Sequence, residues 1–401
     1  MKKGLIISII VIIIAILLVI FFSPIRISVY GNKTEYIKQN EEYKDKGAYT
    51  TFLGIKINQK IKTINEVNTK EINEYKVTYK VKFLNKKAQT TRKVIVQDSE
   101  KPVITILGGK VFLYKGNEYN EYGYIVEDNI DKNLTDKVKT SNNIDINKPG
   151  IYQVKYEVSD SSNNKEEKTR EVEVIEKGSK KDYGLPILMY HFFYDPNVEK
   201  GRDVNWLNIN DFEEQIKYLK ENNFYFPTWK EANDYYDGKI ALPEKSIILT
   251  SDDGNDSFFT LAKPIIEKYD AYMTSFIIGT DDGEQKVKNY QSKNITYQSH
   301  TNGMHQGGCS EQHGSLFLCI NYEKGLNDLK ESIKIVGNSD VLAYPYGDYN
   351  EHTFKLLKDA KINMAVTTEY GRTYQNSNKL KLPRLRISDG YSINYFKNIV
   401  G

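Results

Sequence analysis

Short apolar runs alternate with amphipathic helical stretches from about Leu185 onward, and this alternation constrains the fold more than any other feature of the chain. Such alternation is typical of β/α units around a parallel sheet. It predicts a C-terminal α/β domain over residues 178–401. The runs expected to form strands are Pro186–Tyr190, Ser246–Thr250, Met273–Ile278, Ile295–Ser299, Val341–Tyr344 and Met364–Thr367.

Helices are expected between these runs. One is predicted to begin at Asn210, an N-cap candidate with Glu213 three residues further on, and to present apolar side chains at helical spacing as far as Leu219. Other helices are expected around three apolar groups, Leu261–Ile266, Leu326–Ile333 and Phe354–Ala360.

Polar residues follow several of these strands at the point where each strand ends. They are His191, Asp252 with Asp253, His300, and the run Pro345–Gly347. In β/α barrels the reactive side chains gather at the carboxyl ends of the strands. Separate segments are therefore expected to bring these groups together at one end of the barrel.

Two neighbouring carboxylates and two histidines can form a metal site with a spare base. A divalent metal held by one carboxylate and two imidazoles keeps open positions, as a catalytic site requires. The second carboxylate can then accept a proton. Asp252-Asp253-Gly254 is also an ordinary turn sequence. His300 and His305 are too far out of phase to share one helix face, so a metal site requires a strand end and the following loop.

These segments resemble the polysaccharide deacetylases of the NodB-homology type, carbohydrate esterase family 4. Thr250–Gly254 resembles the first motif, with Ser251 where the family has Phe, and His300-Thr301 with His305 resembles the second. Ala343–Gly347 resembles the third, and Leu382–Ile387 resembles a late arginine-bearing segment. The likeness covers roughly residues 184–395 and implies a distorted (β/α) barrel. The spacing of the two histidines and the run Leu188–His191 are similar to those in the branch of the family that deacetylates poly-N-acetylglucosamine.

The resemblance implies a role for each residue. Asp252 would be the general base, and Asp253, His300 and His305 would bind a divalent metal, with Zn²⁺ expected. The backbone around Tyr346, flanked by Pro345 and Gly347, would help to hold the oxyanion of the tetrahedral intermediate. Arg384 or Arg386 would orient Asp252 and keep it ionised.

The general acid requires a separate argument, because the family's late Leu-x-Leu-His motif is missing. The chain has 5 histidines. His300 and His305 are assigned to the metal, His352 lies just inside an expected helix, and His313 lies in a loop between two cysteines. His191 remains, and the permuted branch of the family uses such an N-terminal histidine as the acid. A buried histidine bonded to backbone stays the alternative.

The N-terminal residues predict the location. Lys2 and Lys3 precede an apolar stretch from Leu5 to Phe22 that only Ser8 interrupts, and this stretch is long enough to cross a bilayer. No Ala-x-Ala-like site follows. Residues 1–24 are therefore expected to be an uncleaved signal anchor with a cytoplasmic tip, and the rest of the chain to be extracellular. A cleaved signal peptide is the alternative.

A repeat lies between the anchor and the α/β domain. Tyr75–Tyr79 recurs as Tyr152–Tyr156, an offset of about 77 residues, and each copy ends in alternating strands. Two all-β sandwiches are expected, over residues 25–98 and 99–177, and they resemble bacterial Ig-like modules. Their expected role is spacing rather than binding of a specific ligand.

Composition limits the partners. The 56 basic and 53 acidic residues give a net charge of +3, which argues against nucleic acid as the main partner. The two cysteines, Cys309 and Cys319, lie outside the membrane in this topology, so a disulfide is plausible and two free thiols are the alternative.

The expected function is N-deacetylation of N-acetylglucosamine residues in a cell-wall or extracellular polysaccharide. Peptidoglycan is the first choice of substrate, because a short tether would hold the enzyme near the wall, and poly-β-1,6-N-acetylglucosamine is the alternative. Two rival functions use the same residues. One is a non-catalytic wall-binding protein, for which Ser251 is the only hint, and the other is a non-haem iron oxygenase, because two histidines and one carboxylate also make that triad.

Overall fold

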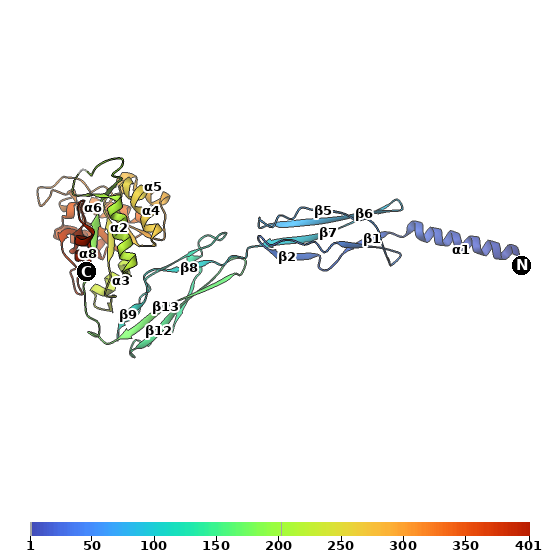
Figure 1. Ribbon diagram of the computed structural model, residues 1–401, viewed down its shortest axis with the longest axis horizontal. Helices are drawn as coiled ribbons and strands as arrows, with labels where there is room; N and C mark the ends of the chain where they lie inside the picture. The colour runs from blue at the N-terminus through green and yellow to red at the C-terminus, as the bar shows by residue number, and fades with distance from the viewer. Residues whose placement is uncertain (1, 202) are drawn as a thin grey trace. The chain divides into compact units, whose positions relative to one another are not determined.

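The computed structural model describes residues 2–201 and 203–401 (Figure 1). By their contacts these residues form two compact units, one of residues 1–103, 126–138 and 158–166, and one of residues 104–125, 139–157 and 167–401. The division runs through the second repeat. The expected borders at residues 24, 98 and 177 stay a prediction.

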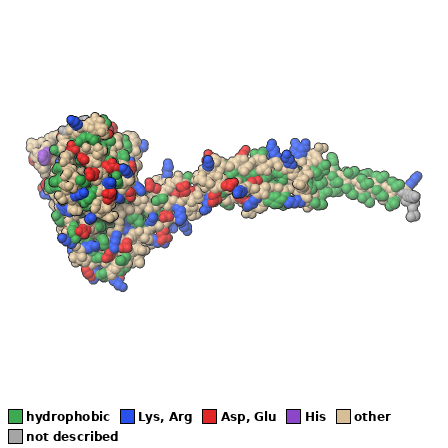
Figure 2. Space-filling model, in the orientation of Figure 1, with side chains coloured by type: hydrophobic (Ala, Val, Ile, Leu, Met, Phe, Trp, Pro, Cys, Tyr) green, Lys and Arg blue, Asp and Glu red, His purple; other side chains and the backbone are tan. Residues whose placement is uncertain are grey.

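The chain begins with helix α1 (Lys2–Phe22), which is apolar on every side. Its described side chains are almost all exposed, and Figure 2 shows them as a continuous apolar surface. Within the described part of the chain, α1 alone is long and apolar enough to cross a membrane. A helix that is apolar all round finds no partner in water, so it must be covered by lipid or by protein.

The first repeat forms two packed sheets. Alternating side chains of the long antiparallel hairpin β6–β7, among them Val77, Tyr79 and Val94, are buried against β1. The period of two explains this, since successive side chains point to opposite faces of a sheet. The sheets have the orders β1-β3-β4 and β2-β7-β6-β5. The strands are β1 (Ile25–Val29), β2 (Thr34–Lys38), β3 (Ala48–Phe52), β4 (Ile55–Ile57), β5 (Lys62–Asn65), β6 (Glu74–Phe83) and β7 (Lys86–Gln97).

The second repeat has the same long hairpin, here β12–β13. Its sheets have the orders β10-β8 and β11-β12-β13-β9-β17. The last strand, β17 (Ile240–Ala241), comes from the C-terminal domain and pairs antiparallel with β9. The remaining strands are β8 (Val103–Ile106), β9 (Val111–Tyr114), β10 (Tyr124–Glu127), β11 (Lys139–Asn142), β12 (Gly150–Ser159) and β13 (Lys165–Ile175).

The C-terminal domain is a closed barrel of seven parallel strands, in the order β14-β18-β19-β20-β21-β22-β23. β14 pairs with both β18 and β23, and these pairings close the barrel. The strands are β14 (Ile187–Tyr190), β18 (Ile248–Ser251), β19 (Met273–Ile277), β20 (Ile295–Ser299), β21 (Val341–Ala343), β22 (Met364–Tyr370) and β23 (Leu382–Arg386). A short parallel pair, β15 (Phe192–Tyr194) with β16 (Trp206–Asn208), follows β14.

Helices connect the strands. They are α2 (Ile209–Glu221), α3 (Trp229–Tyr236), α4 (Lys263–Lys268), α5 (Glu284–Asn289), α6 (Tyr322–Val336), α7 (Glu351–Asp359) and α8 (Ile393–Val400). The predicted N-cap at Asn210 is wrong by two residues. Asn208 caps α2, and its side chain accepts a hydrogen bond from the Asn210 backbone N–H at 2.9 Å. Asn208 ends β16 in an extended conformation, and this is the backbone geometry that an N-cap requires.

Candidate active site

A tight turn after β18 separates the two neighbouring aspartates. Asp253 and Gly254 both have positive φ, 71° and 60°. Glycine suits position 254, because a side chain would be strained at this positive φ and its Cβ would lie 2.6 Å from Ile277 Cδ1. Asp252 is buried with 2 % of its surface exposed, whereas the Asp253 side chain is 20 % exposed. The turn therefore gives two adjacent carboxylates different environments.

Asp252 forms a bidentate ion pair with the buried Arg384. The guanidinium donates to both carboxylate oxygens at 2.7 Å, and Arg384 Nε donates to the Thr367 carbonyl at 2.9 Å. Its Nη1 also lies 3.1 Å from Thr250 Oγ1. Burial raises the pKa of Asp252, but the charge and hydrogen bonds of Arg384 outweigh it and hold the pKa well below its usual range. Asp252 is therefore a fixed, ionised carboxylate.

Asp253, His300 and His305 come together as a cluster. Asp253 Oδ1 lies 3.3 Å from His300 Nε2 and 3.5 Å from His305 Nε2. One ligand atom from each residue lies within 4.8 Å of the others. One carboxylate oxygen and two imidazole nitrogens are a donor set that suits Zn²⁺ and leaves positions open. These residues fit the metal that the sequence predicts.

The two histidines of the cluster differ in their surroundings and in the direction of their pKa shifts. His300 Nδ1 lies 2.8 Å from the Ala343 carbonyl at the end of β21, and because a carbonyl only accepts, Nδ1 carries the proton and Nε2 is free to ligate. Burial lowers the pKa of His300, but the hydrogen bond and the charge of Asp253 more than offset this effect. The pKa of His300 is therefore raised above its usual value. Burial and the charge of His300 lower the pKa of His305 to about 4, so His305 is neutral at pH 7.

His191 follows β14 and lies beside Asp252. Its Nε2 is 3.8 Å from Asp252 Oδ2, and its side chain is 13 % exposed. Burial lowers its pKa, and the nearby Asp252 carboxylate opposes that shift. Ser251, which stands where the resembled motif has Phe, is buried and donates from Oγ to the His191 carbonyl at 3.1 Å. This bond fixes the backbone that carries His191.

Tyr346 follows β21 and has a left-handed backbone, with φ of 61°. Such a conformation is strained for a bulky residue and persists only where neighbours impose it. Its ring lies 4.6 Å from the His305 ring. Pro345 is buried, and a Cβ on Gly347 would lie 2.1 Å from Thr368 Oγ1. The backbone of this run is thus held beside the cluster.

The other candidate residues have partners elsewhere. Arg386 donates to the side chain of Asn205, so Arg384 and not Arg386 is the arginine that binds Asp252. His313 Nδ1 lies 2.6 Å from Asp348 Oδ1 and its side chain is largely exposed. His352 lies in α7 beside the ring of Tyr322.

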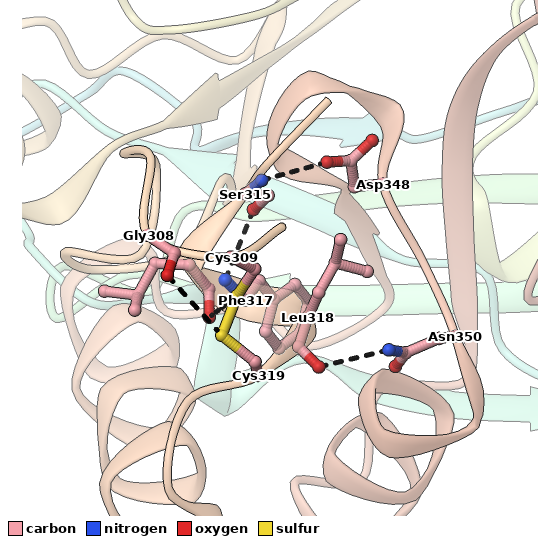
Figure 3. Close-up of a disulfide and its surroundings, with 9 residues drawn as sticks. Gly308, Cys309, Ser315, Phe317, Leu318, Cys319, Asp348 and Asn350 are labelled. Atoms are coloured by element: carbon pink, nitrogen blue, oxygen red, sulfur yellow. Dashed lines mark hydrogen bonds between the residues drawn. A yellow bond between two sulfur atoms is a disulfide. The ribbon is translucent and has the colours of Figure 1, made fainter. Parts of the chain in front are cut away.

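The expected disulfide between Cys309 and Cys319 is present and closes the loop that follows His305 (Figure 3). Within this loop the Ser315 N–H donates to Asp348 Oδ2 at 3.0 Å. The Asn350 side chain donates to the Leu318 carbonyl at 3.1 Å. The loop is therefore tied both to itself and to the segment after β21.

Asp328 has a position that the sequence did not reveal. It lies on α6, and its carboxylate accepts the backbone N–H groups of Asn302 and Gly303 at 2.7 and 2.8 Å. These two residues lie between His300 and His305, so Asp328 holds the loop that joins the two histidines. A single aspartate on an amphipathic helix gives no sequence signal for this role.

The fold and the cluster together define a class. A parallel α/β barrel that carries an Asp-His-His cluster and a buried, arginine-bound aspartate at the ends of its strands provides the donor set and the separate carboxylate that a metal-assisted hydrolase requires. More particularly, the family model of the polysaccharide deacetylases, hydrolases of carbon–nitrogen bonds other than peptide bonds, matches residues 239–365 of the C-terminal domain. The model of the bacterial surface protein Ig-like domain matches residues 27–96 and 104–174. These matches confirm the deacetylase and Ig-like assignments made from sequence.

Individual relatives cover the C-terminal half. YxkH of Bacillus subtilis, which bears the name of a polysaccharide deacetylase, is 29 % identical over 220 residues, 52 % of this chain and 73 % of its own length. The poly-β-1,6-N-acetyl-D-glucosamine N-deacetylase of Staphylococcus aureus (strain MRSA252) is 29 % identical over 216 residues, 50 % of this chain and 72 % of its own. The Streptococcus pyogenes deacetylase PplD in complex with acetate aligns with a TM-score of 0.48 and 23 % identity, covering 55 % of this chain and all of PplD.

Proposed function

We propose that this protein is a metal-dependent N-deacetylase that removes acetyl groups from N-acetylglucosamine residues of an extracellular polysaccharide. The observation that carries the proposal is that the two neighbouring aspartates after β18 have different partners. Asp253 belongs to the Asp-His-His cluster, while Asp252 is held by Arg384 outside it. A metal-dependent amide hydrolase uses both a Lewis acid and a separate proton acceptor, and the different positions of the two aspartates match these needs.

Asp253, His300 and His305 would hold the divalent metal, with zinc favoured by the nitrogen donors. When bound, the metal would polarise the acetamide carbonyl and activate water. Asp252 accepts the proton of the attacking water, because Arg384 keeps it ionised and oriented. His191 donates a proton to the leaving amine nitrogen. It lies 3.8 Å from Asp252 and contributes no ligand to the Asp-His-His cluster.

The strained backbone at Tyr346 would serve the developing oxyanion. A backbone N–H in a fixed conformation stabilises negative charge without reorganisation during the reaction. Tyr346 has positive φ and its ring stands beside His305, so the run Pro345–Gly347 is held next to the metal ligands. Tyr346 is 41 % exposed, so its ring would then offer a face to a sugar.

Poly-β-1,6-N-acetylglucosamine is the substrate that we favour. The specific observation is the likeness to the Staphylococcus aureus enzyme, whose name states that substrate. The spacing of His300 and His305 points the same way. Peptidoglycan, the first choice from the sequence, is the second candidate, because Ig-like modules of a surface-protein family precede the domain.

We further propose that α1 anchors the chain in the cell membrane as a single pass, with all later domains outside. The support is the length and the exposed apolar surface of α1. A disulfide in the catalytic domain suits an oxidising, extracellular compartment.

Acetate release tests the proposal. The zinc-loaded protein is given β-1,6-linked N-acetylglucosamine oligomers, chito-oligosaccharides and purified peptidoglycan, and acetate is measured enzymatically. The β-1,6-linked oligomers are expected to give the highest rate, and a His300→Ala/His305→Ala variant is expected to give none. Faster release from peptidoglycan would reverse the order of the substrates. Oxygen consumption in place of acetate release would show that the cluster is an oxygenase triad.

A further inference from the structure

Three aspartates from separate strand ends meet in the first compact unit, away from the Asp-His-His cluster in sequence. Asp98 follows β7, Asp128 follows β10, and Asp160 follows β12. One carboxylate oxygen from each lies within 4.8 Å of the others. Like charges repel at this distance, so the arrangement needs a compensating group.

Two of the three aspartates are buried, and the hydrogen bonding of the cluster is incomplete. Asp98 and Asp160 are each only 5 % exposed. Asp98 Oδ1 accepts from the Glu100 N–H and from Asn129 Nδ2, but Asp98 Oδ2 is buried and has no partner. Asp128 repeats the pattern, since its Oδ1 accepts two backbone N–H groups and its buried Oδ2 has none.

No basic side chain among the described residues forms an ion pair with any of the three aspartates. A buried carboxylate oxygen without a partner is costly, and an uncompensated buried charge costs more. The two unpartnered oxygens therefore indicate a cationic ligand.

The fold that the two modules share does not explain the presence of these acidic residues. In the first module the hairpin turn between β6 and β7 is Leu84-Asn85, whereas in the second the turn between β12 and β13 runs from Asp160 to Asn164. The longer turn folds on itself, with Asp160 accepting from the backbone and side chain of Asn164. Because the first hairpin folds without an acid, the fold itself does not require Asp160.

We infer that Asp98, Asp128 and Asp160 form a binding site for Ca²⁺. Calcium takes six to eight oxygen ligands in a flexible geometry, and all three donors are carboxylates without nitrogen or sulfur. Carboxylate donors distinguish this site from the Asp-His-His cluster, where imidazoles favour zinc. Water and backbone carbonyls would complete the shell.

Calcium at this site would fasten the connection between the two Ig-like modules. Asp98 begins the five-residue link from β7 to β8, and Asp128 and Asp160 belong to loops of the second module. Asn164 already donates to the Asp98 carbonyl at 3.4 Å. The cation would add a charged bond between the same two segments, so the link would be ordered when Ca²⁺ is bound.

Calcium titration of the full zinc-loaded chain in detergent tests the inference. Isothermal titration calorimetry is expected to show one Ca²⁺ per chain with a Kd on the order of 10⁻⁴ to 10⁻³ M, the range of extracellular modules. Asp98→Asn and Asp128→Asn should each weaken binding roughly tenfold or more, because ligand charge sets the affinity. Asp136→Asn, an exposed acid of the same unit, is the matched control and should bind as the unchanged chain does.

Thermal unfolding separates a cation site from a merely structural cluster. Without Ca²⁺, Asp98→Asn should raise the melting temperature, since it removes one of three repelling charges. With Ca²⁺, the unchanged protein should gain stability and the variant should not. Acetate release from soluble oligomers should be equal in both. No Ca²⁺ binding up to about 10 mM, well above the expected Kd, would overturn the inference whatever the deacetylase assay shows. So would Asp98→Asn and Asp128→Asn variants that bind Ca²⁺ as tightly as the unchanged chain.

Discussion

Asp252 and Asp253 show how one peptide bond can separate two roles. Both are carboxylates, yet Asp252 binds Arg384 inside the barrel and Asp253 faces two histidines. The left-handed conformations of Asp253 and Gly254 create this difference, because they reverse the chain immediately after the strand. The chemistry of this pair therefore depends on backbone shape as much as on residue type.

Replacement of each aspartate by asparagine should separate these roles. Asp252→Asn should retain the metal and lose on the order of a hundredfold or more in turnover, the usual scale of a general base. It should also lose about 3–5 kcal/mol of stability, because Arg384 is left buried without a counter-charge. Asp253→Asn should lose metal affinity instead. Metal content by atomic emission, together with urea unfolding and acetate release, measures all three. Equal metal loss in both variants would disprove the division.

His191→Ala tests the general acid. His191 is outside the Asp-His-His cluster, so the variant should keep its metal. Turnover should fall by roughly a hundred- to ten-thousandfold, as expected for general acid–base catalysis. An acid acts only when protonated and so fails as pH rises, and its removal should therefore flatten the alkaline limb of the pH profile. His313→Ala, which changes an exposed histidine bonded to Asp348, is the control. Near-normal activity of His191→Ala alongside an inactive His313→Ala would place the acid elsewhere.

At the scale of elements, the strand-end loops hold the site. Helix α6 contributes Asp328, which accepts two backbone N–H groups of the loop between His300 and His305. Asp328→Asn keeps the shape but replaces one acceptor oxygen by a donor, so one of the two loop N–H groups loses its partner. Metal affinity should fall roughly 10- to 100-fold, as for other groups that orient metal ligands.

Glu331→Gln is the matched control for this variant, because Glu331 is an exposed acid on the same helix. Competition with a fluorescent zinc chelator gives both affinities. If Asp328→Asn binds zinc as tightly as Glu331→Gln, then the loop does not depend on α6 for its geometry.

Much of the barrel could be predicted because its strands are short runs that contain buried apolar and β-branched residues. Ile295–Ser299 matches β20 at both ends, and the other expected strands overlap their counterparts. β23 was not predicted as a strand, since Leu382-Pro383-Arg384-Leu385-Arg386 carries a proline and two charges. Its role depends on barrel closure, where burial of Arg384 is compensated by Asp252. No local pattern contains that partner, which is 132 positions away in the chain.

For the candidate site too, some contacts could be predicted from the sequence and others could not. Strand ends converge, so the meeting of Asp253 with His300 and His305 could be predicted. Arg384 and Arg386 lie two apart on one strand and therefore share a face, and the sequence could not choose between them. Burial distinguishes the two arginines. Arg384 is fully buried, whereas Arg386 donates a hydrogen bond to Asn205. Ser251 and Asp328 act through backbone groups of other segments, and this kind of contact leaves no motif.

For the whole molecule, removal of the metal should abolish activity without unfolding the barrel. The barrel core is apolar and independent of the cluster, whose residues lie at strand ends. A chelator should therefore remove acetate release while far-ultraviolet circular dichroism stays unchanged, and added Zn²⁺ should restore the rate. Loss of the circular dichroism signal on chelation would mean that the metal is structural.

The pairing of β14 with β23 joins the first and the last strand of the barrel along the chain. β14 is among the first strands of the barrel to leave the ribosome, and β23, which carries Arg384, is the last. Until β23 is seated, Asp252 has no guanidinium to keep it ionised inside the barrel. With Asp252 as the proposed base, a chain still being synthesised or exported would carry every proposed metal ligand but lack a competent base, and hydrolysis would begin only once the last strand had closed the fold.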